Sequence, residues 1–311
     1  MTQYTKLLEN ELQELASRYG LKLIGHQPIE QGAANSNYLL DTKQGKYILT
    51  IFEIEPVRVA HMCKVLELLA EYEFPAPRIQ KQVNENLTTM YQGKPVLVKP
   101  YITGQVIKDP DANLLSQAGT AMARLHEIPI PDFLPDKHTY LTITYPKVIK
   151  DGKDQKYTNW LSHRISALRK KIPSGLPIGL IHGDLFYDNV LFEEENFKAI
   201  LDFEDAHQSH KVFDLGMTVV GLCTEGTTVV LSRVRTLMDG YQKVRLLDMS
   251  ERDSLQLFIE YAAILTSSWR FWKYTLDTPD IKKSRKHLQM VRIAKNVRAM
   301  PKSRFVNTVF A

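Results

Sequence analysis

Apolar residues recur at helical spacing at the start of the chain and then give way to short alternating stretches. Residues 5–19 are expected to form an amphipathic helix, whose apolar side gathers Leu7, Leu8, Leu12 and Leu15. Gly20 follows, as glycine commonly does after a last helical turn. Strands are predicted at 21–25, 38–41 and 47–52, and the last two are expected to form a hairpin.

A single helix interrupts this strand-rich part of the chain. It is predicted over 56–72, because Pro56 suits the first helical position and apolar residues follow at helical spacing. Two more strands are predicted at 87–91 and 95–101. These elements together indicate a β-rich N-terminal lobe over residues 1–101 that carries one internal helix.

The pattern becomes helical beyond this lobe. Helices are predicted from residue 113, over 157–171, and over most of 219–300. The stretch 129–154 is rich in proline and polar residues and is expected to be an irregular surface segment. The predicted fold class is therefore α+β, with two lobes, of which the C-terminal one (102–311) is mainly helical. Nucleotides commonly bind between two such lobes.

Composition and charge change this picture little. The 311 residues are 44% hydrophobic and 24% charged, as in ordinary soluble proteins, and the formal net charge is +5. The densest basic stretch is interpreted as a solvated helix face, with nucleic-acid binding as the alternative, and contains Lys282, Lys283, Arg285, Lys286, Arg292, Lys295 and Arg298. No aromatic platform accompanies these residues, so no nucleic-acid partner is expected.

Two cysteines and the absence of a long apolar run define the expected environment. Cys63 and Cys223 lie far apart in helix-like patterns, so neither a disulfide framework nor a zinc site is predicted. No apolar run approaches about 18 residues, and the N-terminus has no signal-peptide core. A cytoplasmic protein without a membrane partner is expected, and the sequence leaves the oligomeric state open.

The candidate chemistry lies between residues 180 and 214. The segment 181–192 has the His-x-Asp-x-x-x-x-Asn pattern of a kinase catalytic loop, which contains Asp184 and Asn189, and Asp202 follows the next apolar strand. A carboxylate at Asp184 can accept the proton of an attacking hydroxyl, and Asn189 and Asp202 offer the oxygen ligands that Mg²⁺ prefers. The alternatives are that Asp184 ends a strand and that Asn189 and Asp202 belong to turns, but their order after successive strands favours catalysis.

Asp214 follows this region and has two compatible interpretations. It can cap the helix that begins after it. It can also hold the catalytic loop by accepting hydrogen bonds from the backbone N–H groups of that loop.

The segments HGDLFYDNVLF and ILDFEDA resemble the aminoglycoside phosphotransferase and choline kinase superfamily, which has a protein-kinase-like fold. Within it, the chain is most similar to type II homoserine kinases. That family shares the His-x-Asp-Leu-Phe-x-Asp-Asn-Val-x-Phe loop and has stretches like QGAANSNY (31–38), YILTIFE (47–53) and GYQKVRL (240–246). The resemblance implies that Asp184 is the catalytic base and that Asn189 and Asp202 bind Mg²⁺.

The same resemblance implies an ATP site in the N-terminal lobe. The phosphates would be covered by small residues whose backbone N–H groups can approach them closely, namely Gly32, Ala33, Ala34, Asn35 and Ser36. Backbone groups from Lys99 to Tyr101 would contact the adenine. An ordinary turn between strands is the alternative for the first of these segments.

The sequence departs from related kinases at two places. Thr50 stands where many kinases carry a lysine that pairs with the nucleotide phosphates, as it also does in the homoserine kinases, and Lys46 and Arg58 are candidates for the replacing cation. After Asp202, homoserine kinases tend to continue Phe-Tyr-Phe-Ala, whereas this chain continues Phe-Glu-Asp-Ala, which is more similar to choline and ethanolamine kinases. The kinase class is therefore better defined than the acceptor.

The expected function is ATP- and Mg²⁺-dependent transfer of a phosphoryl group to a small-molecule hydroxyl, with homoserine as the first choice. Choline, ethanolamine or another amino alcohol is the alternative, and an inactive nucleotide-binding pseudokinase is a distant one. Asp205 and Arg270 are the candidate acceptor ligands, for the ammonium and the carboxylate of homoserine. The aromatic residues around Arg270 are interpreted either as part of that pocket or as core.

Overall fold

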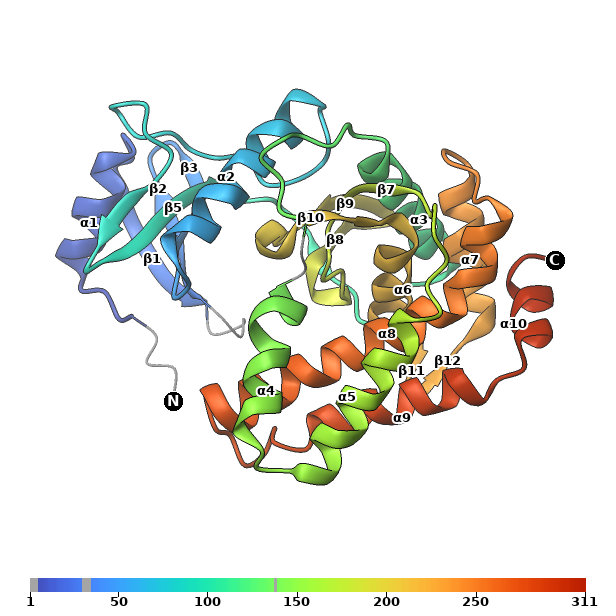
Figure 1. The fold of residues 1–311 in the computed structure, drawn as a ribbon. Helices are drawn as coiled ribbons and strands as arrows, with labels where there is room; N and C mark the ends of the chain where they lie inside the picture. Colours follow the sequence, from blue (N-terminus) through green and yellow to red (C-terminus); the bar gives the residue numbers. More distant parts are fainter. Residues whose placement is uncertain (1–4, 30–34, 137–138) are drawn as a thin grey trace. The chain divides into compact units, whose positions relative to one another are not determined.

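A computed structural model describes residues 5–29, 35–136 and 139–311 (Figure 1). Its contacts divide the chain into two compact units. The N-terminal unit runs to Gly104 and also includes Lys198–Glu204, and the C-terminal unit contains Gln105–Phe197 and Asp205–Ala311. The predicted division into 1–101 and 102–311 followed sequence order, whereas the segment 198–204 packs with the first part of the chain.

A five-stranded antiparallel sheet forms the centre of the N-terminal unit. Its strand order is β1-β2-β3-β5-β4. The strands are β1 (Leu23–Ile29), β2 (Ser36–Thr42), β3 (Gly45–Ile51), β4 (Thr89–Tyr91) and β5 (Lys94–Pro100). Ser36 pairs with Ile51 and Thr42 with Gly45, which confirms the expected hairpin.

Helix α1 (Glu9–Arg18) covers one face of this sheet (Figure 1). Leu12 and Leu15 are buried in one cluster with Leu40 of β2. Leu8, expected on the same apolar side, is 67% exposed. The helix begins only at Glu9, so Leu8 lies at the N-cap position, before the first turn, and the helical spacing that grouped it with the other leucines does not apply.

The strand register places a different set of side chains on the opposite face. Thr50 pairs with Asn37 of β2 and with Leu97 of β5, and Ile48 pairs with Lys99. Directly paired residues of antiparallel strands point to the same face. Asn37, Thr50 and Lys99 therefore share the face that α1 does not cover.

Helix α2 (Pro56–Glu71) begins at its proline, as predicted. Strand β9 (Asn196–Ile200) brings the later segment to the chain just after α2, where the Ile200 N–H donates to the Pro75 carbonyl at 3.0 Å. Phe203 packs edge-on against Phe74, with ring centroids 6.3 Å apart. These contacts attach the segment 198–204 to the N-terminal unit.

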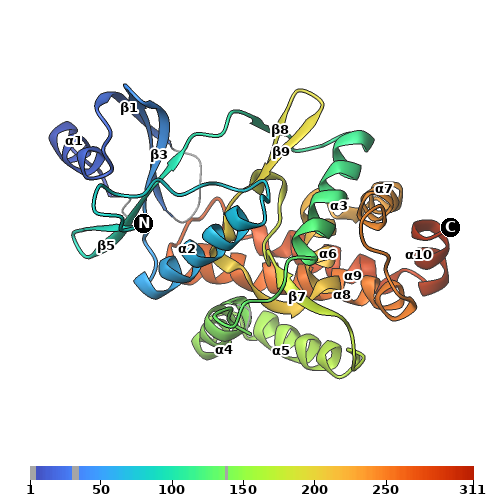
Figure 2. The same ribbon diagram turned by 90° about the horizontal axis from the view of Figure 1, so that it is seen from above.

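Helices dominate the C-terminal unit (Figure 2). The long helix α8 packs against α6 and α9, and α4 and α5 also contact it. These helices are α4 (Tyr145–Asp151), α5 (Gln155–Arg169), α6 (Lys211–Leu222), α8 (Met249–Phe271) and α9 (Lys286–Ala299). The remaining ones are α3 (Ala112–His126), α7 (Leu231–Gln242) and α10 (Lys302–Val309).

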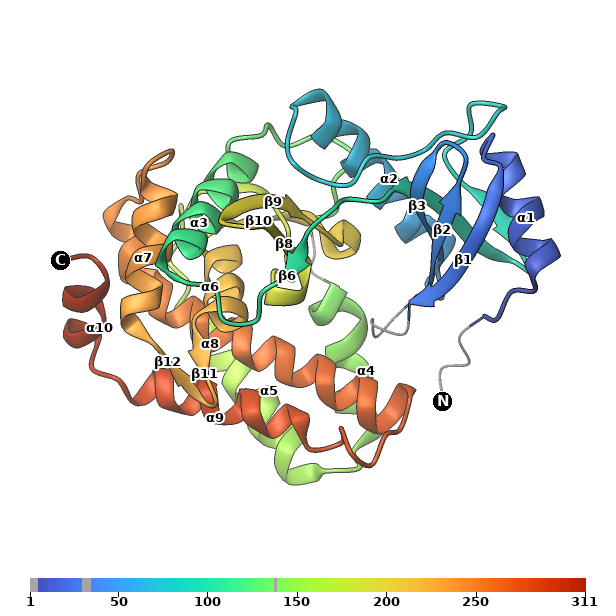
Figure 3. The same ribbon diagram turned by 180° about the vertical axis from the view of Figure 1, so that it is seen from behind.

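Helices α3 and α7 lie side by side, and two glycines allow their close approach (Figure 3). A Cβ atom on Gly119 of α3 would overlap the Leu237 carbonyl, and one on Gly240 of α7 would overlap the Ser116 carbonyl. Each glycine therefore lets the other helix's backbone come into contact. This packing brings the C-terminal residue of α3, His126, to α7.

Short strand pairs complete the C-terminal unit. Strand β7 (Ile178–Ile181) pairs with β10 (His207–His210), and β11 (Thr224–Glu225) pairs with β12 (Thr228–Val229). Strand β6 (Gln105–Val106) pairs with β8 (Val190–Glu193) in the same antiparallel manner. Strand β10 was not predicted, because its sequence His-Gln-Ser-His is polar and only its pairing with β7 makes it a strand.

The structure corrects the prediction that residues 129–154 are irregular throughout. A π-helical turn (Tyr140–Thr144) leads into α4. Tyr140, Thr144 and Val148 recur every four residues and are buried, but Pro146 and polar neighbours hid this spacing. Pro146 lies within the first two positions of α4, where proline is tolerated. Among the described residues, no helix is long and apolar enough to cross a membrane.

Candidate active site

The candidate catalytic loop follows strand β7. Gly183 has φ +84°, and a Cβ atom there would come within 2.8 Å of the Asp205 carbonyl oxygen, so only glycine fits between β7 and the start of β10. The Asp184 N–H donates to Nδ1 of the buried His182 at 3.2 Å. A 3₁₀ turn at Tyr187–Asn189 then ends the loop.

Asn189 is tied to the same loop as Asp184. Its amide nitrogen Nδ2 donates to the Asp184 carbonyl at 2.9 Å, and its backbone N–H donates to the Phe186 carbonyl, also at 2.9 Å. Because Nδ2 is used in this way, the oxygen Oδ1 is the part of the amide that could serve as a cation ligand. The structure thus brings Asp184 and Asn189 together in one hydrogen-bonded loop, as predicted.

Asp214 holds this loop from the first turn of α6. The two carboxylate oxygens accept hydrogen bonds from the backbone N–H groups of His182 and Gly183, both at 2.8 Å. This confirms the predicted loop-holding role. The predicted capping role is wrong, because the N-cap of α6 is His210 and Asp214 lies one turn inside the helix.

A buried chain of polar side chains extends from Asp214 to the end of α7. His126 Nε2 lies 3.1 Å from Asp214 Oδ2, and His126 Nδ1 lies 2.8 Å from the Tyr241 hydroxyl. Arg245 donates to that hydroxyl at 3.1 Å and pairs with both oxygens of the buried Glu251. Sequence analysis missed this network because its members lie far apart in the chain.

The pKa values of His126 and Asp214 follow from burial and hydrogen bonding. Burial lowers the pKa of His126 below its ordinary value, although Asp214 opposes this shift. Burial alone would raise the pKa of Asp214, but its hydrogen bonds to His126 and to the Gly183 N–H, together with nearby histidines, hold it below its usual range. With Asp214 ionised and His126 neutral, Nε2–H donates to Asp214 and Nδ1 accepts from Tyr241.

Acid is expected to weaken the fold through His126. The ordinary pKa of His126 is 6.5, and its pKa in the folded protein is lower. Below pH 6.5 the unfolded chain therefore binds more protons than the folded protein, and stability falls as the pH is lowered. Each such histidine contributes a slope of up to about 1.4 kcal/mol per pH unit. His126→Gln should reduce the slope of the unfolding free energy between about pH 7.5 and 5.5, measured by urea denaturation.

The control for this prediction is His163→Gln, because His163 is an exposed residue of α5. Burial also lowers the pKa values of His210 and His287, so part of the slope should remain in the His126 variant. An unchanged slope in His126→Gln would contradict the assignment. Asp214 affects stability over a separate pH range. Its pKa is lowered in the folded protein, so the stability that it contributes is lost only in stronger acid, below its ordinary value of 3.8.

Arg270, predicted as an acceptor ligand, lies near the catalytic loop. It is half-buried in the last turn of α8, and burial lowers the pKa of its guanidinium, while Asp184 and Asp188 are among the charges that oppose the shift. Its NH1 donates to Gln289 Oε1 at 3.0 Å. Asp184 and Arg270 thus lie within electrostatic reach of each other. Asp205 lies at the end of a short 3₁₀ turn. Its carbonyl oxygen is hydrogen-bonded to Nδ1 of His207 at 2.8 Å.

The aromatic residues around Arg270 divide into two groups. Phe271 is buried and packs against Tyr157, so it belongs to the core. Trp269 is only half-buried and stacks on Tyr140, with Tyr274 edge-on at 6.0 Å. The core interpretation therefore holds for Phe271, and the pocket interpretation of Trp269 stays a prediction.

Three of the predicted phosphate-loop residues, Gly32, Ala33 and Ala34, lie outside the described residues. Asn35 donates through Nδ2 to Glu204, and its Oδ1 accepts from the Glu53 N–H at 3.2 Å. The Ser36 hydroxyl donates to Glu53 at 2.9 Å and accepts from the Thr5 N–H at 2.8 Å. Both side chains therefore fix the chain at the end of this loop.

Asp202, the predicted metal ligand, has an unusual backbone. Its φ is +59°, in the left-handed region that costs a non-glycine residue about 1–3 kcal/mol. The other described non-glycine residues with positive φ lie in turns or directly after a helix, whereas Asp202 follows strand β9 and precedes a 3₁₀ turn. Such strain is often retained where a side chain must be aimed for function.

Lys99 was predicted to act through its backbone, yet its side chain is the more distinctive group. The Tyr101 N–H donates to the Lys46 carbonyl, so these two residues form a hydrogen-bonded pair of the antiparallel ladder. Such pairs recur at every second position, so Lys99 and Ile48 form the next one. Within the predicted adenine segment, the Pro100 carbonyl is the group directed away from β3. A lysine within the apolar stretch Val96–Val98 and Pro100 is a signal that sequence analysis could have used.

Thr50 is part of the sheet's own hydrogen bonding. It is buried, and its hydroxyl donates to Asn37 Oδ1 at 2.8 Å. The two candidate replacement cations lie elsewhere: Lys46 is exposed at the start of β3, and Arg58 is in the first turn of α2.

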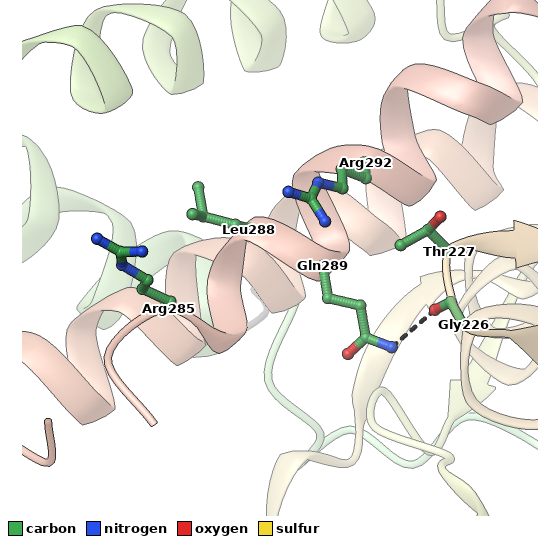
Figure 4. Close-up of a pocket in the computed structure, with 6 residues that line it drawn as sticks. All are labelled: Gly226, Thr227, Arg285, Leu288, Gln289 and Arg292. Atoms are coloured by element: carbon green, nitrogen blue, oxygen red, sulfur yellow. Dashed lines mark hydrogen bonds between the residues drawn. The ribbon is translucent and has the colours of Figure 1, made fainter. Parts of the chain in front are cut away.

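A surface groove in the C-terminal unit is lined by none of the predicted site residues. It has a volume of about 420 Å³ and is lined by Gly226, Thr227, Arg285, Leu288, Gln289 and Arg292 (Figure 4). Gln289, which accepts from Arg270, donates to the Gly226 carbonyl at 2.7 Å. Across the described part of the chain, no cluster of three or more His, Cys, Asp or Glu residues could hold a metal alone.

The phosphotransferase enzyme family model matches residues 25–247, which span both units and the whole catalytic loop. The chain belongs to this phosphotransferase family. The prediction of a phosphotransferase enzyme acting on small molecules is thereby confirmed.

Individual relatives agree with this assignment. The homoserine kinase of Bartonella tribocorum is 28% identical over 291 residues, which cover 90% of this chain and 91% of the relative. An amicoumacin kinase, solved with AMP-PNP and Ca²⁺, has a TM-score of 0.73 at 14% identity, covering 95% of both chains. A microcompartment-associated aminopropanol kinase has a TM-score of 0.72 at 16% identity, covering 96% of this chain and 98% of the other. The two structures confirm the predicted α+β kinase-like fold.

Proposed function

We propose that this phosphotransferase is an ATP- and Mg²⁺-dependent homoserine kinase. The single observation that carries the proposal is the catalytic loop of the C-terminal unit, in which hydrogen bonds from Asp214 and Asn189 fix the backbone at Asp184, with the cation of Arg270 in electrostatic reach. A carboxylate-bearing alcohol bound by Arg270 would thus have its hydroxyl near a base. The name of the Bartonella relative supports the same acceptor.

Asp184 is proposed to act as the base. Phosphoryl transfer needs orientation of the hydroxyl and removal of its proton, and a carboxylate within hydrogen-bond reach does both. The Asp214 hydrogen bonds fix the two residues before Asp184, and the Asn189 side chain fixes its carbonyl. The position of the base is therefore set by a buried framework rather than by the exposed surface.

Asn189 and Asp202 are proposed to hold Mg²⁺, which would neutralise charge on the transferred phosphoryl group. The donor set fits this ion, because Mg²⁺ prefers hard oxygen ligands and is usually held by one or two protein groups together with waters and phosphate oxygens. The Oδ1 of Asn189 and the carboxylate of Asp202 would supply such oxygens.

Arg270→Ala is expected to raise the KM for homoserine about tenfold to a hundredfold, because an Arg–carboxylate hydrogen bond contributes roughly 1.5–3 kcal/mol. The KM for ATP should change little. Steady-state kinetics with each substrate varied in turn would measure both. Arg298→Ala, at an exposed position in the last turn of α9, is the control. Equal changes in the two KM values would remove Arg270 from the acceptor site.

An amino alcohol without a carboxylate is the second candidate acceptor. The half-buried Trp269 with Tyr140 and Tyr274 favours it, because aromatic faces attract an ammonium group. A coupled ADP-release assay on homoserine, choline, ethanolamine and 1-amino-2-propanol would distinguish the candidates. Preferential turnover of choline or ethanolamine would exclude homoserine as the main acceptor, and no turnover of any alcohol would favour the inactive pseudokinase.

A further inference from the structure

The N-terminal unit lacks a lysine at the third-strand position that pairs with nucleotide phosphates in many kinases. Thr50 occupies this position and uses its hydroxyl within the sheet, to Asn37. The triphosphate of ATP carries several negative charges, and kinases neutralise part of that charge with a cation as well as a metal ion. A cation in this unit therefore remains to be assigned.

Lys99 lies on the neighbouring strand and on the same face of the sheet. Its partner across the ladder is Ile48, two residues from Thr50 on β3, and the register places Thr50 opposite Leu97. Side chains two residues apart on one strand point to the same face. Lys99 of β5 and Thr50 of β3 are therefore diagonal neighbours on adjacent strands. A lysine side chain is long enough to span the distance between such neighbours.

Two acidic residues lie within electrostatic reach of the Lys99 ammonium. Lys99 interacts electrostatically with Asp202 and Glu204, both within the segment 198–204 that packs in this unit. Glu204 in turn accepts a hydrogen bond from Asn35, at the end of the predicted phosphate loop. Lys99 thus lies within electrostatic reach of the proposed metal ligand and of the residue that bonds Asn35. It is half-buried although it is surrounded in sequence by apolar residues.

We propose that Lys99 supplies the phosphate-neutralising cation that the third strand lacks, so that its side chain binds the phosphates of the nucleotide beside Asp202. The inference rests on the proposed function, because it requires a nucleotide in the N-terminal unit. It gives Lys99 a different role from the backbone contact with adenine that the sequence predicted. It also makes a lysine at residue 50 unnecessary.

Equilibrium nucleotide binding tests this role independently of turnover. Lys99→Met should weaken binding of ATP with Mg²⁺ about tenfold to a hundredfold, as loss of a hydrogen bond to a charged group does, and should leave adenosine binding unchanged. Lys99→Arg should retain most of the ATP affinity. Isothermal titration calorimetry would measure both ligands, with Lys43→Met, at an exposed hairpin residue, as the charge-matched control. Lys99→Gln serves as a second neutral variant if the Met variant does not fold.

Moving the cation back to the third strand is a sharper test. Thr50→Lys alone should give no gain in ATP affinity, whereas adding Thr50→Lys to Lys99→Met should recover part of what was lost. A large gain from Thr50→Lys alone would overturn the inference, because it would mean that the wild-type protein has no cation at the phosphates. Equal losses of ATP and adenosine affinity in Lys99→Met would also overturn it, by indicating a structural role.

The two proposals fail in different ways. If the wild-type protein binds and turns over ATP but Lys99→Met binds it as well as wild type, only the role of Lys99 is wrong. If the wild-type protein binds no nucleotide, both the role of Lys99 and the proposed function are wrong.

Discussion

Replacing Asp184 by asparagine is expected to lower kcat by about a hundredfold or more, the contribution of a general base. The substitution keeps the size of the side chain and removes its capacity to take a proton. The backbone of the loop should stay in place, because it is held by Asp214 and by the Asn189 side chain. ATP affinity should change little. Turnover measured by ADP release, with nucleotide binding measured separately, distinguishes the two effects.

The same loop offers a matched control for this variant. Asp188 lies four residues further on, is exposed, and loses the same charge when it is changed to asparagine. Asp188→Asn should leave kcat within a few-fold of the wild-type value, because it removes no proton acceptor from the proposed mechanism. Near-normal turnover in a folded Asp184→Asn protein would remove Asp184 from the mechanism.

The second large effect is expected at the proposed metal ligands. Asp202→Ala should lower ATP turnover strongly and raise the Mg²⁺ concentration needed for half-maximal activity, because the ion loses a charged ligand. Asn189→Ala should act in the same direction but less, since an amide oxygen carries no net charge. Titration of activity with Mg²⁺ in the three proteins would show the order. Alanine keeps the Cβ atom that strains the left-handed backbone of Asp202, so the thermal stability of the variant should be measured beside its activity.

Asp41→Ala provides the control for the metal experiment. Asp41 is an exposed carboxylate of β2 in the same unit, so the substitution matches the change in charge and in size. Its Mg²⁺ titration should coincide with that of the wild type. Full activity of the wild-type protein without added divalent metal would contradict the metal assignment as a whole.

Local sequence determined the elements that the site is built from. The hairpin, α2, and the loop with Asp184 and Asn189 were predictable, because strand alternation, a proline at the first helical position and a tight loop pattern depend on neighbouring residues. The loop-holding role of Asp214 was predictable for a related reason, since it follows the loop closely in the chain. The same local information failed for Leu8, whose place before the first turn of α1 depends on where that helix begins.

Tertiary structure decided which distant residues meet. His126 reaches Asp214 because Gly119 and Gly240 let α3 and α7 approach, and no local pattern encodes that packing. Lys99 comes within electrostatic reach of the acidic residues at 202 and 204, about a hundred residues away in sequence, because the segment 198–204 packs in the N-terminal unit. Periodicity reports which face of an element is buried, whereas the partner of that face depends on the register and crossing of elements, which only the folded chain specifies.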